Sequence, residues 1–417
     1  MFQALKKEIS SFSGRELLFI MSAMLCSFLI AADYAIIRPV SNSLFIFSYG
    51  SSFFPYAWLA TVPLNLLVVY LYSRFLPRFG CLKMFLIIAL IIGGGNLFCA
   101  LFIKKISILP FIFYIWKEIY ILLMFQQLWS VIHSTIDTKR AKYLYGIIFG
   151  IGGIGGALGS LVPGFLAVKF GSENLLFFSL PIYALLFYFF MQFLKRSSIS
   201  GEIQKEMPVK DAFEAVRNIR SSPFLLFILL IVIFMQMSST LIDFQFNSTL
   251  EQNILGKDLR TEYTGRILSI VNLITIGLQF VGSYLLVQFL GMRLSHFAIP
   301  ALLCLNAAAF LITPAFGVIS FSYVTIKSFD FSLFNIIKEM LYIPLKTDEK
   351  FRAKAFIDIF AYRSAKAFAS FLILFLQFAA GTSLLSCISW GVLLLFIAWG
   401  ITVIRLMERD PIKEKGL

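Results

Sequence analysis

Five basic side chains lie well inside stretches that are otherwise apolar enough to cross a membrane: Arg38, Lys117, Lys327, Arg363 and Lys366. A sixth, Lys338, lies close enough to the end of its stretch to reach the membrane surface. A charge at the centre of a bilayer costs on the order of 3 kcal/mol even on permissive insertion scales. These side chains are therefore expected to face an interior cavity or to pair with other charges. Arg363 and Lys366 are three residues apart, and like charges at this helical spacing are unfavourable unless an anion lies between or opposite them. The pattern favours binding of an anion.

Carboxylates occur in the same kind of stretch and are natural counter-charges for these cations: Asp33, Glu118, Asp243, Asp330 and Asp358. Lys327 and Asp330 are three residues apart, so an intrahelical ion pair can form between them. We hypothesise that the carboxylates pair with the cations in the empty protein and release them when a substrate binds. Pairing of the Arg363 and Lys366 cations with Asp243 or Asp358 is the alternative to an anionic substrate.

The composition places most of the chain in lipid. Of its 417 residues, 59% are hydrophobic and 14% charged, whereas ordinary soluble domains carry about 25% charged residues. The 2 histidines argue against histidine metal sites and hydrolase triads, so no metal, cofactor or catalytic residue is expected. A membrane-embedded enzyme or a non-transporting scaffold remains the alternative from another class.

Twelve stretches are long enough for a membrane helix, which needs roughly 20 apolar residues. They are 17–40, 53–76, 83–103, 109–133, 143–169, 174–195, 223–247, 265–290, 293–317, 319–341, 354–380 and 383–405. Of the 36 lysines and arginines, 24 fall in the termini and even-numbered connections, 6 in the odd-numbered connections and 6 within the stretches. Because cytoplasmic loops collect cations, both termini are expected in the cytoplasm. The predicted fold class is an all-α membrane protein with twelve transmembrane helices.

The chain divides into two halves that resemble each other in sequence. The longest internal polar stretch, 196–222, separates an N-terminal six-helix bundle (1–195) from a C-terminal one (223–417). Within this linker, residues 209–219 show the pattern of an amphipathic helix at the membrane surface, although a solvated tether fits equally well. Lys117 and Lys327 stand at an offset of 210, and the run 137–142 resembles 348–354. Parallel six-helix repeats are the plan of the major facilitator superfamily.

The fifth stretch is rich in glycine and contains a literal Gly-x-Gly-x-x-Gly at Gly150, Gly152 and Gly155. A dinucleotide site is not expected, because that motif needs a preceding strand in a βαβ unit. Small residues four apart allow two membrane helices to approach closely. The glycines therefore predict helix packing.

One segment resembles the signature of a known family. Residues 338–345 read Lys-Glu-Met-Leu-Tyr-Ile-Pro-Leu, and 354–358 read Lys-Ala-Phe-Ile-Asp before Arg363 and Lys366. This run is similar to the non-mitochondrial ADP/ATP translocase (Tlc) family of nucleotide transporters of plastids and obligate intracellular bacteria. The segments 34–38 and 127–129 are similar to blocks in the first and fourth helices of that family. The resemblance implies exchange of nucleotides across the inner membrane of a bacterial cell.

The chain departs from the family pattern at three places. The family's Arg-x-x-Lys-Asp appears here as Arg-Pro-Val-Ser-Asn at 38–42, and its fourth-helix glutamate is Gln127. The Glu-x-x-Trp-Lys pattern of its seventh helix appears as Asp-Phe-Gln-Phe-Asn at 243–247. Two lost lysines weaken the binding of a tri- or tetra-anion more than that of a smaller one. A smaller nucleotide or another phosphorylated metabolite is therefore an equal expectation.

Together these features predict a transporter of an organic anion, a nucleotide by resemblance, that works by alternating access. The expected substrate-binding residues are Arg38, Lys117, Lys327, Arg363, Lys366, Gln127 and Asn247. Asp33, Glu118, Asp243, Asp330 and Asp358 are expected to pair with the cations and to gate the path. The alternative is a proton-coupled transporter of a neutral or weakly charged metabolite, in which Asp33 or Glu118 binds the proton. The expected partners are a small anionic substrate and the bilayer; we expect a monomer and no nucleic acid.

Overall fold

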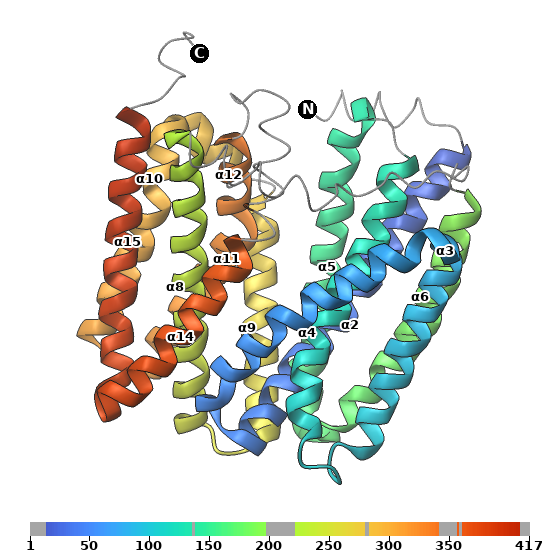
Figure 1. The fold of residues 1–417 in the computed structure, drawn as a ribbon, viewed down its shortest axis with the longest axis horizontal. Coiled ribbons are helices and arrows are strands. Elements are labelled where there is room, and N and C mark those ends of the chain that lie inside the picture. The colour runs from blue at the N-terminus through green and yellow to red at the C-terminus, as the bar shows by residue number, and fades with distance from the viewer. Residues whose placement is uncertain are drawn as a thin grey trace. The chain divides into compact units, whose positions relative to one another are not determined.

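The structure is a computed structural model that describes residues 14–135, 138–196, 222–279, 283–341, 357 and 361–408. The described residues form helices joined by short turns, without a strand among them. They separate into two compact units (Figure 1). The proposed linker helix at 209–219, the echoed run at 348–354, Asp358 and most of 338–358 lie outside the described residues.

Unit 1 takes its residues from Met1–Gly50, Pro63–Glu206 and Ile254–Leu273. Its central helix is α2 (Gly14–Tyr49), which packs against α4, α5 and α6 (Figure 1). Its elements are α2 (Gly14–Tyr49), α4 (Leu109–Thr135), α5 (Thr138–Phe170), η2 (Asn174–Phe178) and α6 (Ser179–Arg196). Two-thirds of the most apolar part of α2 is buried, so this helix forms the core of unit 1 and can carry polar groups away from lipid.

Unit 2 takes its residues from Ser51–Val62, Met207–Asn253 and Ile274–Leu417. Here α8 holds the central place and packs against α11, α14 and α15. The elements are η1 (Ser51–Phe53), α8 (Pro223–Asn253), α10 (Ser283–Ile312), α11 (Phe316–Phe329), the π-helical turn η4 (Asp330–Phe334), α12 (Asn335–Leu341), α14 (Tyr362–Ala380), η6 (Gly381–Ser383) and α15 (Leu384–Glu408). The first helix of each predicted half, α2 or α8, is thus the core of its unit.

Two helices are divided between the units. α3 (Phe54–Phe102) begins in unit 2 and continues in unit 1 from Pro63, and α9 (Lys257–Gly277) begins in unit 1 and leaves it after Leu273. α3 also joins the second and third predicted spans, with a break at Gly80, whose φ of 71° and ψ of 166° are not helical. A left-handed φ of this kind favours glycine, because it lacks the Cβ that would clash.

The described helices agree with a multi-span membrane protein. Eight segments are long and apolar enough to cross a membrane among the described residues, and the last, Tyr362–Leu406, contains α14 and nearly all of α15. Each of the twelve predicted spans has a helical counterpart, although helix ends differ; α9 starts at Lys257 where 265 was expected. The early start matters because charged residues before 265 belong to the helix.

The glycines of α5 lie against the backbone of α2, which confirms the packing interpretation. A Cβ atom on Gly155 would overlap the carbonyl oxygen of Phe28, and one on Gly159 would overlap that of Ala32. Both approaches are closer than real Cβ contacts, and the neighbouring atoms are backbone that cannot turn aside. Only glycine permits this approach of the two helices.

Adding one methyl group at this contact should destabilise the protein. Gly159→Ala is expected to lower the free energy of unfolding by about 1–3 kcal/mol, the usual cost of overpacking, and to lower the melting midpoint of the purified protein in detergent. Gly93→Ala is the matched control, because a Cβ there meets nothing within 4 Å and alanine is the better helix former. Equal melting midpoints for the two variants would contradict the packing.

Candidate functional site

In unit 1, Lys117 of α4 lies in a buried polar cluster facing α2. Its side chain is 1% exposed, and its ammonium group donates to Oδ1 of Asn42 at 2.5 Å. The same group lies 3.7 Å from a carboxylate oxygen of Glu118 and 4.0 Å from the ring centroid of Tyr114. Tyr34 donates to Glu118 at 3.3 Å. A buried cation beside an aromatic face and an amide is equipped to hold an anionic ligand once its protein contacts loosen.

Asp33 lies in a second cluster of unit 1. It is 1% exposed, and one carboxylate oxygen accepts hydrogen bonds from Tyr120 at 3.0 Å and Tyr183 at 3.2 Å. Its other oxygen has no hydrogen-bond partner among the described residues. Asp33 therefore accepts hydrogen bonds from hydroxyl groups of α4 and α6. In the described part of the chain it forms no ion pair, and its pairing with a cation stays a prediction.

In unit 2, Lys327 of α11 occupies a place like that of Lys117. It is 6% exposed and donates to the carboxylate of Asp243 at 2.5 Å and to the hydroxyl of Ser239 at 2.9 Å, both on α8. Its ammonium group lies 5.8 Å from the ring centroid of Tyr323, and that ring stacks on Phe246 with centroids 4.2 Å apart. A buried lysine of the fourth predicted helix thus contacts the first helix of its half in both units.

The intrahelical pair expected between Lys327 and Asp330 is not the one that forms. Lys327 turns to Asp243, whereas Asp330, 3% exposed, accepts from the side-chain amide of Gln236 at 3.1 Å. Asp330 begins a π-helical turn, and such turns widen the helix and often occur at functional sites. A spacing rule for a regular α-helix could not anticipate this arrangement.

The two cations of α14 have separate surroundings. The ammonium group of Lys366 lies 5.5 Å from the ring centroid of Trp58, within unit 2. Arg363, one turn earlier, is half-buried, and Arg38 in unit 1 is also half-buried. Their expected carboxylate partner Asp358 lies outside the described residues. Neither Arg363 nor Lys366 is joined by an ion pair to Asp243, whose described ion pair is with Lys327.

The two substrate residues suggested by the family resemblance are buried. Gln127 of α4 is fully buried, and Asn247 of α8 is 3% exposed. The Asn247 amide donates to the backbone carbonyl of Asp243 at 2.7 Å, while its own side-chain oxygen accepts no hydrogen bond from the described residues. Asn247 follows Asp243 by one turn, so it lies near the Lys327 cluster and can offer an acceptor to it.

Several residues of these clusters were not anticipated from the sequence. They are Asn42, Tyr114, Tyr120, Tyr183, Gln236, Ser239 and Tyr323. The one available signal was the tyrosine that precedes each buried lysine by about one helical turn, Tyr114 before Lys117 and Tyr323 before Lys327. Residues three or four apart share a helix face, so both lysines carry an aromatic ring beside them.

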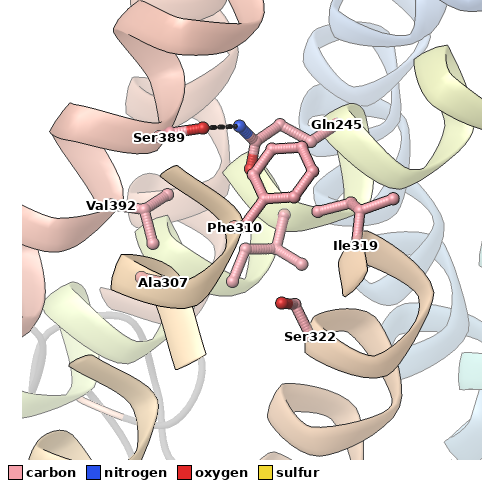
Figure 2. Close-up of a pocket in the computed structure, with 8 residues that line it drawn as sticks. Gln245, Ala307, Phe310, Ile319, Ser322, Ser389 and Val392 are labelled. Atoms are coloured by element: carbon pink, nitrogen blue, oxygen red, sulfur yellow. Dashed lines mark hydrogen bonds between the residues drawn. The ribbon is translucent and has the colours of Figure 1, made fainter. Parts of the chain in front are cut away.

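A small pocket elsewhere in unit 2 does not belong to these clusters. Figure 2 shows it between α8, α10, α11 and α15, lined largely by apolar side chains such as Phe310 and Ile319. Gln245 points into it and donates to the hydroxyl of Ser389 at 2.7 Å (Figure 2). The pocket contains no charged residue and none of the predicted site residues.

Comparison with family models shows which fold these clusters belong to. The model of the major facilitator superfamily matches residues 23–342. The chain belongs to the major facilitator superfamily. A second model, that of the TLC ATP/ADP transporter, matches residues 305–409, the part of this major facilitator chain in which the sequence resemblance was densest. No curated protein matches the chain in sequence.

Solved transporter structures support the same fold for this superfamily member. The peptide transporter PepTSo has a TM-score of 0.65 at 11% identity, covering 94% of this chain and 99% of its own. A point mutant of the nucleoside transporter NupG has a TM-score of 0.63 at 13% identity, covering 94% and 99%. The inward-open xylose transporter XylE from E. coli has a TM-score of 0.61 at 15% identity, covering 94% and 95%. These likenesses show the fold alone.

The two family matches decide three sequence predictions. The fold class, an all-α membrane protein of the major facilitator type, is confirmed, and so is the resemblance to the Tlc family at the C-terminal end. The superfamily consists of carriers, so the chain is a multi-pass membrane transporter of a small molecule and not an enzyme. The domain limits and the site residues stay predictions.

Proposed function

We propose that this carrier transports an organic anion, a nucleotide of the ATP/ADP type, by exchange across a bacterial inner membrane. The observation that carries the proposal is the pair of buried lysines, Lys117 and Lys327, each held between an aromatic ring and polar atoms of the first helix of its half. The TLC ATP/ADP transporter match over residues 305–409 supports a nucleotide as the anion.

The chemistry of these clusters fits a phosphorylated ligand. In the empty protein, Asn42 holds Lys117, and Asp243 with Ser239 holds Lys327. Phosphate oxygens can replace the amide, hydroxyl and carboxylate acceptors, because all are oxygens and the phosphate carries more charge. In this proposal the pair of Lys327 with Asp243 must break before the carrier reorients, and breaking a buried pair without an anion to take its place is costly. That cost favours exchange over net uptake.

The remaining cations set how much charge the substrate can carry. Arg38, Arg363 and Lys366 complete the proposed binding set, and Gln127 and Asn247 supply hydrogen bonds without charge. Two lysines of the family pattern are missing. A substrate that carries fewer phosphates than ATP is therefore as well supported as ATP or ADP. A phosphorylated sugar shares the same chemistry without the base.

Thermal-shift measurements on the purified protein test the ligand class. Ligand binding to the folded state raises the apparent stability by about 2.7 kcal/mol at a hundredfold excess over Kd. We expect ATP, ADP or AMP to raise the melting midpoint and adenosine, at equal concentration, to leave it unchanged. Stabilisation by phosphorylated sugars but by no nucleotide would keep the anion and reject the nucleotide. No shift with any phosphorylated compound would reject both.

A proton-coupled transporter is the second candidate, and the surroundings of Asp33 favour it. This buried carboxyl group has tyrosine hydroxyl partners, and no cation lies within ion-pair distance of it in the described part of the chain. Membrane carboxyls in such places often bind and release protons during transport. Uptake into proteoliposomes that collapses on addition of a protonophore would support this candidate, and exchange that persists would support the antiporter.

A further inference from the structure

The two lysine clusters are built on the same frame. Asn42 and Asp243, which hold the buried lysine of unit 1 and of unit 2, stand at an offset of 201. Three residues after each of them comes a phenylalanine, Phe45 or Phe246. Its ring contacts the tyrosine beside the lysine, with ring centroids 4.8 Å apart in unit 1 and 4.2 Å apart in unit 2. Because the frames match, the positions at which they differ indicate what each cluster can bind.

The first helices of the two units differ along the face that carries these partners. In α8, Ser239, Asp243 and Asn247 follow one another at intervals of four residues, so their side chains share one face of the helix. We call these three residues the acceptor row. The face of α2 at the same offset holds a cation, an amide and an apolar side chain: Arg38, Asn42 and Ile46. Unit 2 therefore offers hydrogen-bond acceptors at two positions where unit 1 has none.

One member of the acceptor row, Asn247, has a buried oxygen that needs a donor. Its amide nitrogen donates to the backbone carbonyl of Asp243 at 2.7 Å, which fixes the way the amide points. Its Oδ1 is buried and accepts no hydrogen bond from the described residues. Buried polar atoms nearly always have a partner, because an unsatisfied one loses its hydration without compensation. An ionised phosphate has only acceptors, so the partner that fits Oδ1 is a hydroxyl or an amine.

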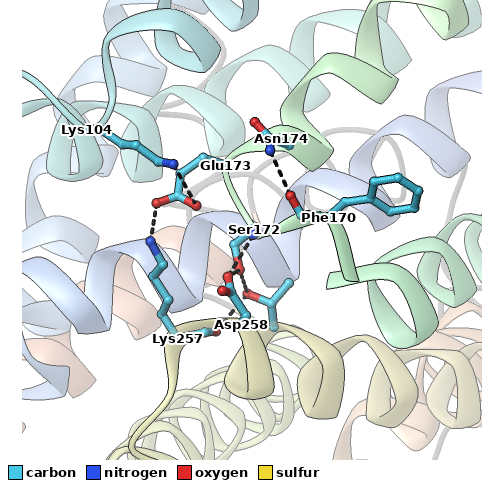
Figure 3. A network of polar contacts seen from close by, with 8 residues as sticks. Lys104, Phe170, Ser172, Glu173, Asn174, Lys257 and Asp258 are labelled. Atoms are coloured by element: carbon cyan, nitrogen blue, oxygen red, sulfur yellow. Dashed lines mark hydrogen bonds and ion pairs between the residues drawn. The ribbon is translucent and has the colours of Figure 1, made fainter. Parts of the chain in front are cut away.

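A polar network elsewhere, in unit 1, shows the contrasting case (Figure 3). Glu173, 5% exposed, forms an ion pair with Lys257 through one carboxylate oxygen, and Lys104 lies 4.0 Å from the other. Ser172 donates to one carboxylate oxygen of Asp258 through its backbone N–H at 2.7 Å and through its hydroxyl at 2.6 Å. Both carboxylates of this network face donors of the chain itself. The network is complete without a ligand, whereas the acceptor row is not.

Asp243 is the member of the acceptor row that a ligand can reach first. Its side chain is 19% exposed, whereas Ser239 and Asn247 are almost fully covered. In the proposed function a phosphate takes the place of Asp243 at Lys327, and the carboxylate then needs a new donor. The substrate supplies that donor if it carries a hydroxyl or an amine near its phosphate. Carboxylates bind the ribose hydroxyl groups of dinucleotides in this manner in other proteins.

We propose that Asp243 and Asn247 form a subsite for the sugar hydroxyl groups of the substrate, so that the carrier selects phosphates attached to a hydroxylated sugar. Both residues lie on α8 in unit 2, one helical turn apart. A neutral hydroxyl satisfies the carboxylate and the amide oxygen, whereas a further phosphate would be repelled by the carboxylate. The subsite rests on the proposed transport of a phosphorylated anion. The amine of a base shares the donor chemistry, and the ligands tested below distinguish the two.

Nucleotides of equal charge that differ in one donor test the subsite. The Kd values of AMP, 2′,3′-dideoxy-AMP and purine riboside monophosphate, which lacks the amine, are measured by thermal-shift titration of the purified protein. We expect the dideoxy compound to bind at least about tenfold more weakly than AMP, because buried acceptors are left without a donor. Purine riboside monophosphate should bind like AMP. Equal Kd values for AMP and the dideoxy compound would overturn the subsite, and so would a loss of affinity that follows the amine alone.

A substitution assigns this discrimination to Asn247. Asn247→Leu removes the acceptor at similar size, and Asn253→Leu is the matched control. Asn253 makes the same bond to a carbonyl four residues back, that of Thr249, at 2.8 Å, but it is exposed at the end of α8. The ratio of the Kd of dideoxy-AMP to that of AMP should fall severalfold in Asn247→Leu and keep its native value in Asn253→Leu. If Asn247 only holds a structural water, Asn247→Leu changes both Kd values equally, and an unchanged ratio would overturn the proposal.

A pair of simpler phosphates separates the subsite from the nucleotide assignment. If no nucleotide binds, ribose 5-phosphate is compared with methyl phosphate. A preference for ribose 5-phosphate that falls in Asn247→Leu would support the subsite and reject the nucleotide. Nucleotide binding with the native ratio in Asn247→Leu would keep the nucleotide and overturn the subsite. Binding of no phosphorylated compound would overturn both.

Discussion

Transport should be lost when Lys327 is replaced by glutamine, and it should stay lost when Asp243 is replaced by asparagine at the same time. Lys327 is buried and donates to Asp243 and Ser239. In the proposal Lys327 also pairs with the substrate phosphate, and truncating one partner of such a buried charge pair costs about 2–5 kcal/mol, which corresponds to a loss of roughly 30-fold or more in transport. The rate of nucleotide exchange in proteoliposomes measures this loss.

The double variant separates binding from folding. Lys327→Gln alone leaves the Asp243 carboxylate without its cation, so the amount of folded protein should fall. Lys327→Gln/Asp243→Asn removes both charges, so the amount recovered in size-exclusion chromatography should return while exchange does not. Lys169→Gln, at an exposed lysine in the last turn of α5, should leave both unchanged. Recovery of exchange in the double variant would show that Lys327 acts only as a partner for Asp243.

The repeat in the sequence predicted the most about the site. The offset of 210 between Lys117 and Lys327 predicted equivalent places, and in the structure each lysine contacts the first helix of its half. The length of the apolar stretches predicted the helices, because a helix that crosses a bilayer needs about 20 apolar residues whatever residues flank it. The glycines of α5 predicted close helix packing, since the effect depends only on the missing Cβ.

Contacts between distant segments could not be read from spacing. Asn42 and Lys117 are 75 residues apart, and nothing local indicates which face of α2 meets α4. The geometry of a regular helix predicted an ion pair between Lys327 and Asp330. In the structure, Asp330 begins a π-helical turn and Lys327 pairs with Asp243 of the neighbouring helix α8. Glu173 and Lys257 meet only after α9 has been placed against unit 1. These choices are made by tertiary packing.

Replacing Arg363 and Lys366 together by glutamine should abolish uptake without changing membrane insertion. Both cations lie on α14 outside any carboxylate pair in the described residues, and Lys366 rests over Trp58. If they hold the anion, losing both should cost at least as much as losing Lys327, about 30-fold or more in exchange rate. Exchange in proteoliposomes, normalised to the amount of inserted protein, measures the effect.

The control for this pair is Arg405→Gln, because Arg405 is an exposed arginine in the last turn of α15. It should exchange nucleotide at the native rate. Uptake that is undiminished in Arg363→Gln/Lys366→Gln would overturn the assignment of these two cations to the substrate path. Loss of inserted protein, instead, would mean that they stabilise the fold.

The central claim is that the buried cations of this carrier hold a phosphorylated anion. The most direct measurement is exchange of radiolabelled ADP by the purified protein in proteoliposomes, with unlabelled ATP, ADP, AMP and adenosine as competitors. We expect unlabelled ATP, ADP and AMP to compete with radiolabelled ADP for exchange, and adenosine to have no effect. Competition by adenosine equal to that of its nucleotides, or uptake of a neutral solute in place of any nucleotide, would contradict the account.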